Sequence, residues 1–359
     1  MDNNTLIKEE KEIRKILHAI PEKSLCEVKT RRVILSYLNA LEGIEIVDKG
    51  EWFYAFYKGK DSKKKIAFRA DYDAVEGKDT KVGHYCGHDG HCATLLVFAK
   101  YISDLKPDND IYFIFQPAEE IGKGALMCRD MVVEEEIDEI YGFHNIPKFK
   151  RGNILVKKGV FACASGGLRI SIDGSPSHAA YPEHGKNPVL IIASTIEYCN
   201  SLSSYDKDDL AFVTVIGVEL GSDAYGVSAS NGILKLTFRA QRQEHFDDLF
   251  KQIISYVNKK CLEEDMSFEY ESIETFASTK NNDDCVDRII SVCKDKNLST
   301  QEVSEPFRWS EDFGYYLEVC KGAFFGVGDG EDYSQLHTED FEYLDEISRY
   351  ALQVFMGLI

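Results

Sequence analysis

The sequence lacks any apolar run that approaches the roughly 18 residues needed to span a bilayer, so we expect no membrane-spanning segment. Positive charge is also scarce: 42 Lys and Arg residues stand against 61 Asp and Glu residues, which gives a formal net charge of −19. Such a field repels polyanions and provides no basic surface for nucleic acid or for an anionic membrane. We therefore expect neither as a partner.

The first residues, 1–12, are polar and acidic, and they lack the basic start and apolar core of a signal peptide. The ten cysteines are mostly scattered along the chain. Without an export signal, this usage fits a reducing compartment better than a disulfide framework. The expected location is cytoplasmic. The sequence also contains no internal repeat and no low-complexity stretch.

What the chain does contain is the composition of an ordinary globular protein, with 44% hydrophobic and 29% charged residues in 359. Disordered, collagen-like and fibrous classes are excluded. Single hydrophobic cores stop growing near this chain length, so we expect two domains.

Strands and helices alternate in the first part of the chain. Apolar runs at Ile66–Phe68, Ile111–Phe115 and Ile140–Phe143 predict strands, and the first two are separated by a helical pattern through Leu95, Ala99 and Ile102. This alternation predicts an α/β domain with a mostly parallel sheet covered by helices. Ligands bind such sheets beyond the carboxyl ends of the strands, where polar residues are found here. These are Asp71 and Asp73, Glu119 and Glu120, and His144.

The middle of the chain has a different order of elements. Strands are expected at 168–172, 211–218, 233–239 and 266–270, with helices at 187–199 and near 246–258. The order β-α-β-β-α-β matches a ferredoxin-like α+β unit inserted into the first domain. We therefore predict a first domain made of residues 1–163 and 274–359, and an inserted domain of residues 164–273.

The densest chemical cluster is CGHDGH at residues 86–91, which holds Cys86, His88 and His91 beside a predicted helix start. A thiolate with nearby imidazoles suits zinc, cobalt or manganese. The alternative is a buried cysteine beside polar residues that cap the helix.

Two carboxylates follow a predicted strand in FQPAEE at residues 115–120. In a regular strand Glu119 and Glu120 would face opposite ways, so a shared site requires the turn that Pro117 favours. One carboxylate could then bind metal while the other acts as a general base. The alternative is a solvated pair of loop glutamates.

Two further histidines stand in GFHNIP at 142–147 and in LHTEDFEY at 336–343. Only His144 shares the predicted sheet edge; the pattern alone gives His337 no support, and a lone histidine is more often structural.

Taken in order, these motifs resemble the amidohydrolase branch of the dinuclear metallopeptidases, which includes hippurate hydrolase, auxin-conjugate hydrolases, N-acetyldiaminopimelate deacetylase and, more distantly, carboxypeptidase G and aminoacylase. The resemblance covers nearly the whole chain, and several ordered matches are more specific than any single one. The matching segments are IRKILHAIPEKS (13–24), FRADYDAV (68–75), CGHDGH, FQPAEE, GFHNIP, GSPSHAAYPEHGKNP (174–188), RWSEDFGYY (308–316) and LHTEDFEY.

The resemblance implies a set of roles for the residues of the first domain. Glu119 would be the general base, and Asp71 would orient the site from behind the ligands, with Asp73 and His91 as further candidates for that support. The ligands of two divalent ions, zinc, manganese or cobalt, would be Cys86, His88, Glu120, His144 and His337.

The resemblance also implies that the inserted domain forms a homodimer contact and acts as a lid. His178 would reach the active site of the neighbouring subunit and stabilise the oxyanion. Arg239 belongs to the retained TxR strand. The asparagine that holds substrate in relatives is missing, because residues 226–229 replace an Asn-Val-Ile-Pro segment, and Asn231 could substitute from a different position.

The implied reaction is hydrolysis of N-acetyl or N-aroyl amino acids to a carboxylic acid and a free amino acid. Two alternatives stay open: a dipeptidase or carboxypeptidase, and a metal-bound but inactive binding protein. Two departures concern substrate choice: the altered segment 226–229, and a short stretch before the histidine cluster in which Tyr85 replaces a small residue.

Overall fold

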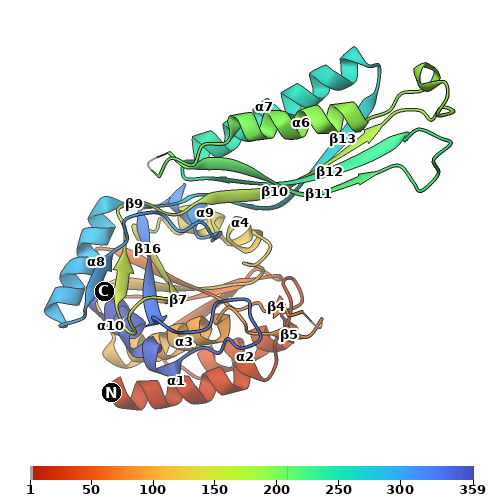
Figure 1. The fold of residues 1–359 in the computed structure, drawn as a ribbon. Helices are drawn as coiled ribbons and strands as arrows, with labels where there is room; N and C mark the ends of the chain where they lie inside the picture. Colours follow the sequence, from red (N-terminus) through yellow and green to blue (C-terminus); the bar gives the residue numbers. More distant parts are fainter. Residues whose placement is uncertain (1–2, 79, 208) are drawn as a thin grey trace. The chain divides into compact units, whose positions relative to one another are not determined.

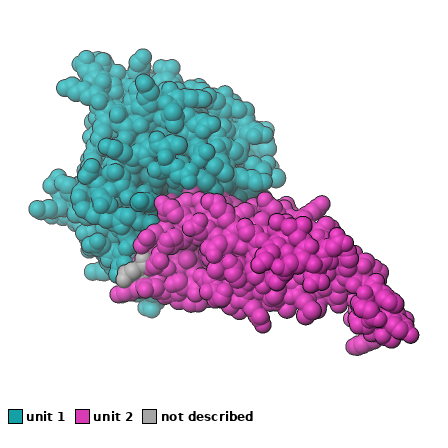
Figure 2. Space-filling model, turned by 90° about the horizontal axis from the view of Figure 1, so that it is seen from above, with its two compact units in different colours: residues 1–161, 279–304, 311–359 teal, residues 162–278, 305–310 magenta. Residues whose placement is uncertain are grey.

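A computed structural model of the protein describes residues 3–78, 80–207 and 209–359. The chain divides into two compact units, each continuous in space but not in sequence (Figure 2). Unit 1 comprises residues 1–161, 279–304 and 311–359, and unit 2 comprises residues 162–278 and 305–310. We predicted residues 162–163, 274–278 and 305–310 in the first domain, whereas they belong to unit 2. Within unit 2 the backbone N–H of Cys163 donates to the carbonyl of Phe307 at 2.9 Å.

Unit 1 is built on a mixed sheet with a parallel centre (Figure 1). The central strands β6, β3, β7 and β16 run parallel, whereas β1 and β2 pair antiparallel at one side. This arrangement confirms the predicted mostly parallel α/β sheet. In spatial order the strands are β1 (Ile44–Asp48), β2 (Phe53–Tyr57), β6 (Asp110–Gln116), β3 (Lys65–Asp71), β7 (Glu139–Pro147), β16 (Gly322–Gly330), β8 (Ile154–Val156) and β15 (Thr300–Glu302).

Helices cover both faces of this sheet (Figure 1). The strands β3, β6 and β7 are buried over almost their whole length, as expected for strands covered on two sides. The helices of unit 1 are α1 (Asn3–His18), α2 (Val28–Leu38), α3 (His88–Leu105), α4 (Gly124–Cys128), α5 (Asp130–Glu134), α8 (Asp283–Asp295), α9 (Gly314–Leu317) and α10 (Ser348–Leu358). The shorter strands are β4 (Val75–Glu76), β5 (Val82–Gly83), β9 (Gly159–Ala162) and β14 (Thr279–Asn281).

Unit 2 confirms the predicted β-α-β-β-α-β order. Its antiparallel sheet has the order β11-β12-β10-β13, and two helices pack on one face of it (Figure 1). Along β12 every second residue is buried, which is the alternation of a sheet covered on one face only. The elements are β10 (Ala164–Asp173), α6 (Val189–Leu202), β11 (Ala211–Leu220), β12 (Asn231–Ala240), α7 (Gln243–Glu263) and β13 (Ser267–Phe276).

No helix in the described part of the chain is both long and apolar enough to cross a membrane.

Candidate active site

Three parallel strands of unit 1 carry polar residues at or near the same end of the sheet. Asp71 is the last residue of β3, and the segment with Glu119 and Glu120 follows β6. One detail of the prediction is wrong: His144 lies inside β7 rather than beyond its end. The reason is that β16 continues to pair with β7 as far as Pro147, so the strand does not stop at Phe143.

Local backbone conformations turn the side chains toward one site. Gly87 adopts a left-handed φ of +97° between Cys86 and the start of α3, a conformation that glycine tolerates without strain. After Pro117, Ala118 has a positive φ of +53° and breaks the strand alternation. Carboxylate oxygens of both following glutamates consequently lie in one group with His88.

The five residues predicted as metal ligands lie together, and the thiol of Cys86 is shared by two groups of them. Its Sγ lies 3.4 Å from Nε2 of His144 and 3.2 Å from Nε2 of His337. Oε1 of Glu120 lies 3.6 Å from Nε2 of His88 and 3.6 Å from Nε2 of His337. A tetrahedral ion with bonds of about 2.0–2.3 Å separates its ligands by about 3.3–3.8 Å. Three of the four spacings fall in this range, and the distance between Cys86 and His337 is slightly shorter.

Two atoms of this cluster are buried without any partner. Nε2 of His88 and Oε1 of Glu120 make no hydrogen bond with any described residue. An unpaired buried polar atom costs about 1–3 kcal/mol, and a cation ligated by both atoms would remove that cost. The donor set of one thiol, three imidazoles and a carboxylate therefore fits zinc-like divalent ions.

Metal binding at this cluster would be coupled to proton release. Burial, together with Glu120 and Glu119, raises the pKa of the Cys86 thiol well above its usual range. Burial lowers the pKa of His88, but Asp71 and Asp73 outweigh it and bring the pKa to about 10. Ligation requires a thiolate and a neutral imidazole, so both groups would lose a proton on binding a metal ion.

Supporting residues fix the imidazole rings from behind. Nδ1 of His88 lies 3.1 Å from Oδ1 of Asp73, and Oδ2 of Asp73 accepts a hydrogen bond from the backbone of Glu120. Asp71 instead contacts His91, with 2.7 Å between Oδ1 and Nδ1. The other ring nitrogen of His91 lies 2.7 Å from Oδ1 of Asn145. In this arrangement Asp73 rather than Asp71 holds a predicted ligand directly.

A buried arginine to which we assigned no role from the sequence contacts acidic residues next to the site. Arg69 donates to Asp71 at 2.7 Å and to Asp312 at 2.8 Å, and it lies 3.1 Å from Glu311. The two acidic residues belong to the motif RWSEDFGYY, which was recognised without a role for either residue. Their proximity to Arg69 depends on a contact across 243 residues of sequence, which no local pattern reveals.

Glu119 lies against this acidic group and is almost fully buried. Oε1 of Glu119 accepts a hydrogen bond from the backbone N–H of Asp312 at 3.4 Å, and Oε2 lies 4.0 Å from Nε2 of His88. Burial and the neighbouring Glu311 carboxylate raise the pKa of Glu119 well above its ordinary value. A carboxylate with a raised pKa is a suitable acceptor and donor of protons.

The remaining predicted residues lie in unit 2. His178 is exposed in the loop before α6, and its segment pairs with the altered segment at Val227. Arg239 is partly buried and donates to the carbonyl of Arg308. Asn231 is exposed at the opposite end of β12. Asn231 and Arg239 are eight residue steps apart along the strand, which is about 26 Å at 3.3 Å per residue.

Comparison with known proteins decides the family. The profile described as peptidase family M20/M25/M40 matches residues 67–359, which is most of the chain. The chain belongs to this family. It is 28% identical over 349 residues to the N-acetyldiaminopimelate deacetylase of Leuconostoc mesenteroides, covering 91% of this chain and 90% of the relative. It is also 28% identical to the hippurate hydrolase of Campylobacter jejuni, covering 96% and 94%.

Solved structures share the fold. A protein from methicillin-resistant Staphylococcus aureus superposes with a TM-score of 0.90 at 19% identity, covering 99% of this chain and 96% of that one. A Bacillus subtilis protein described as a dinuclear metal binding peptidase from the M20 family gives a TM-score of 0.83 at 24% identity, covering 99% and 98%. Family membership makes the chain a hydrolase of amide bonds, in agreement with the amidohydrolase predicted from the motifs.

Proposed function

We propose that the protein hydrolyses the amide bond of N-acyl amino acids, with an N-acetyl or N-aroyl group, and releases a carboxylic acid and a free amino acid. The observation that carries this proposal is the position of Glu119, buried directly beside His88 and Glu120, two candidate ligands whose Nε2 and Oε1 atoms make no hydrogen bond with any described residue. The names of the two curated relatives, a deacetylase and a hippurate hydrolase, support the same bond type.

We further propose that two divalent ions, zinc, manganese or cobalt, belong to this site. Cys86, His88, Glu120, His144 and His337 would hold them. When bound, such ions polarise a carbonyl group and increase the acidity of water. The spacing of the ligand atoms and the two unpaired buried atoms support the assignment.

Glu119 carries out the proton transfers. Its Oε1 is anchored by the N–H of Asp312, which leaves Oε2 on the side of His88 to take a proton from the attacking water. Glu119 then holds that proton until the leaving amine takes it. Asp73 holds the His88 ring in place, and Asp71 does the same for His91.

A homodimer through unit 2 belongs to this proposal. Strand β11 is an edge strand, and its Ile216 is 61% exposed, while Leu190 on α6 is 77% exposed. Exposed apolar residues at a sheet edge favour association. Because Asn231 and Arg239 lie about 26 Å apart along β12, one small substrate could contact both only if two subunits contributed. His178 would then serve the active site of the neighbouring subunit.

The cytoplasmic location also stays a proposal. All ten cysteines lie in the described part of the chain and are free thiols, which suits a reducing compartment.

The test is release of free amino acid from a panel of N-acetyl, N-benzoyl and N-succinyl amino acids and of dipeptides. The enzyme is kept reduced and is loaded separately with zinc, manganese or cobalt. Release from acylated substrates that a chelator abolishes is the expected result. Faster cleavage of dipeptides would make the protein a dipeptidase or carboxypeptidase, and no turnover with metal bound would favour a binding protein.

A further inference from the structure

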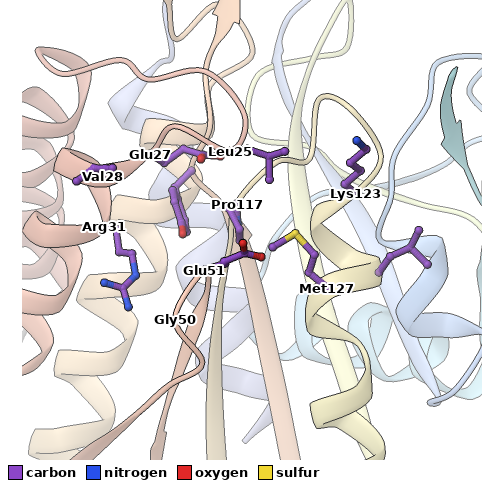
Figure 3. A pocket seen from close by; sticks show the side chains of 11 residues that line it. Leu25, Glu27, Val28, Arg31, Gly50, Glu51, Pro117, Lys123 and Met127 are labelled. Carbon is purple, nitrogen blue, oxygen red and sulfur yellow. The ribbon is translucent and has the colours of Figure 1, made fainter.

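A cavity of about 640 Å³ opens on unit 1 behind the segments that carry the candidate active site (Figure 3). Tyr72 and Pro117 form part of its wall. Tyr72 stands between Asp71 and Asp73, whose carboxylates contact the histidines of the site. Successive side chains of an extended segment point to opposite sides, so this cavity is separate from the ligand cluster. Its volume is typical of small-molecule sites.

The wall of the cavity is largely apolar and unusually exposed. Leu25, Val28 and Leu126 line it with exposed fractions of 54%, 63% and 41%, and Met127 completes this surface. Large apolar side chains that stay exposed and converge on one hollow mark a place where a ligand covers them. The ligand therefore has a sizeable apolar part.

Both signs of charge are present around this apolar wall. Figure 3 shows Arg31 and Lys123 on opposite sides of the cavity, with Glu51 between them in that view. Arg31 uses Nη2 for Asp48. Neither Lys123 nor Glu51 forms an ion pair with any residue that the structure describes. Lys123 and Glu51, a cation and a carboxylate without an ion-pair partner among the described residues, suit a ligand that carries a carboxylate and an ammonium group.

We propose that this cavity binds a free α-amino acid with a large apolar or aromatic side chain. The carboxylate of the ligand faces Lys123, its ammonium group faces Glu51, and its side chain covers Leu126 and its apolar neighbours. Such an amino acid is of the class that the proposed reaction releases. A role in product sensing rests on the proposed function, whereas binding itself does not.

The cavity has a direct connection to the segment that holds Glu119. Oε1 of Glu27, which lines the cavity, accepts a hydrogen bond from the backbone N–H of Ala118 at 2.8 Å. Ala118 has the positive φ that sets the direction of Glu119. A ligand packed against Glu27 and Pro117 therefore acts on the conformation of the general base, and its occupancy changes turnover.

The experiment is titration calorimetry on the metal-loaded full chain with phenylalanine as the probe. Two matched ligands lack one charge each: 3-phenylpropanoate has no ammonium group and 2-phenylethylamine has no carboxylate. Leu126→Glu places a carboxylate in the apolar wall. Leu105→Glu is the control, because Leu105 is a leucine of similar exposure, 47%, on α3 and outside the cavity.

Phenylalanine is expected to bind once per subunit, and both one-charge analogues at least tenfold more weakly. Leu126→Glu is expected to weaken phenylalanine binding at least tenfold, Glu51→Gln to weaken it severalfold, and Leu105→Glu to change it less than twofold. Added phenylalanine should change kcat in the wild type and in Leu105→Glu but not in Leu126→Glu.

Three results would overturn the proposal. The first is no binding of phenylalanine to the wild type, and the second is equal binding to Leu126→Glu, which would place the ligand elsewhere. The third is equal binding of 3-phenylpropanoate, which would remove Glu51 from the site. If no substrate of the panel is turned over, calorimetry still decides the cavity, so failure of the proposed function stays distinguishable.

Discussion

Sγ of Cys86 lies 3.2 Å from Nε2 of His337, although 251 positions separate the two residues in the sequence. The same sulfur lies 3.4 Å from His144, so one thiol connects the two groups of candidate ligands. Its burial and the nearby carboxylates keep it protonated without a cation, as the raised pKa indicates. A metal ion that binds this thiol must therefore displace its proton.

Replacing this thiol should therefore lower metal content. We expect Cys86→Ser to retain at most about one divalent ion per subunit where the wild type retains two, because a serine hydroxyl is a poor ligand for zinc-like ions. Metal analysis after gel filtration measures this. Cys26→Ser is the matched control, since Cys26 is exposed and outside the cluster. Unchanged metal content in Cys86→Ser would remove the thiol from the ligand set.

The general base should be separable from metal binding. Glu119→Gln keeps the size and hydrogen-bonding ability of the side chain but cannot accept a proton. We expect both metal ions to stay bound and kcat to fall by about 10²–10⁴-fold or more, the range of a lost general base. Single-turnover rates together with metal analysis check both parts. Turnover near the wild-type rate would assign the proton transfer to another residue.

Local sequence order predicted much of this site because its chemistry is concentrated in short motifs. Cys86, His88 and His91 fall within six residues, and Glu119 and Glu120 are adjacent. His144 was predicted at the right sheet edge, although the end of its strand was set by pairing with β16. The central strands were also predictable, since each is a continuous apolar run.

Other features depend on contacts that no short pattern encodes. The buried ion pairs of Arg69 with Asp312 and Glu311, for example, join residues that are far apart in the sequence. The cavity beside Pro117 is formed by four separate segments, and none of its lining residues has a distinctive spacing. Motif reasoning therefore identifies candidate ligands and a candidate base, while the residues that contact them and the cavities become visible only in the folded chain.

The proposed homodimer makes a prediction about mixed subunits. If His178 serves the neighbouring active site, a heterodimer of a Glu119→Gln subunit and a His178→Ala subunit contains one intact site. Co-expression with two purification tags should give heterodimers with about half of the wild-type kcat per dimer, while each homodimeric variant is impaired. Inactive heterodimers would show that His178 acts within its own subunit, and an unimpaired His178→Ala homodimer would show that it has no role. Size-exclusion chromatography with light scattering verifies that each variant is a dimer.

The stability of the folded protein should depend on pH through a buried carboxyl group, Glu10, that has no part in the proposed reaction. Glu10 on α1 is fully buried; its Oε1 accepts a hydrogen bond from Ser348 at 2.8 Å, and its Oε2 has no partner among the described residues. Burial raises its pKa from 4.5 to about 8, only partly opposed by the Ser348 hydrogen bond. The folded state therefore keeps this proton at pH values where the unfolded chain has lost it.

The sign follows from proton linkage: between about pH 4.5 and 8 the folded state binds more protons at Glu10, so its contribution to stability is lost as pH rises. Glu10→Gln does not titrate. We expect the free energy of unfolding of the wild type, measured with urea, to fall between about pH 5 and pH 8. In Glu10→Gln this fall should be smaller by at least about 1 kcal/mol. Glu12→Gln, on the same helix but exposed, should follow the wild type. Parallel pH profiles for Glu10→Gln and the wild type would mean that Glu10 is already ionised in the folded protein at neutral pH.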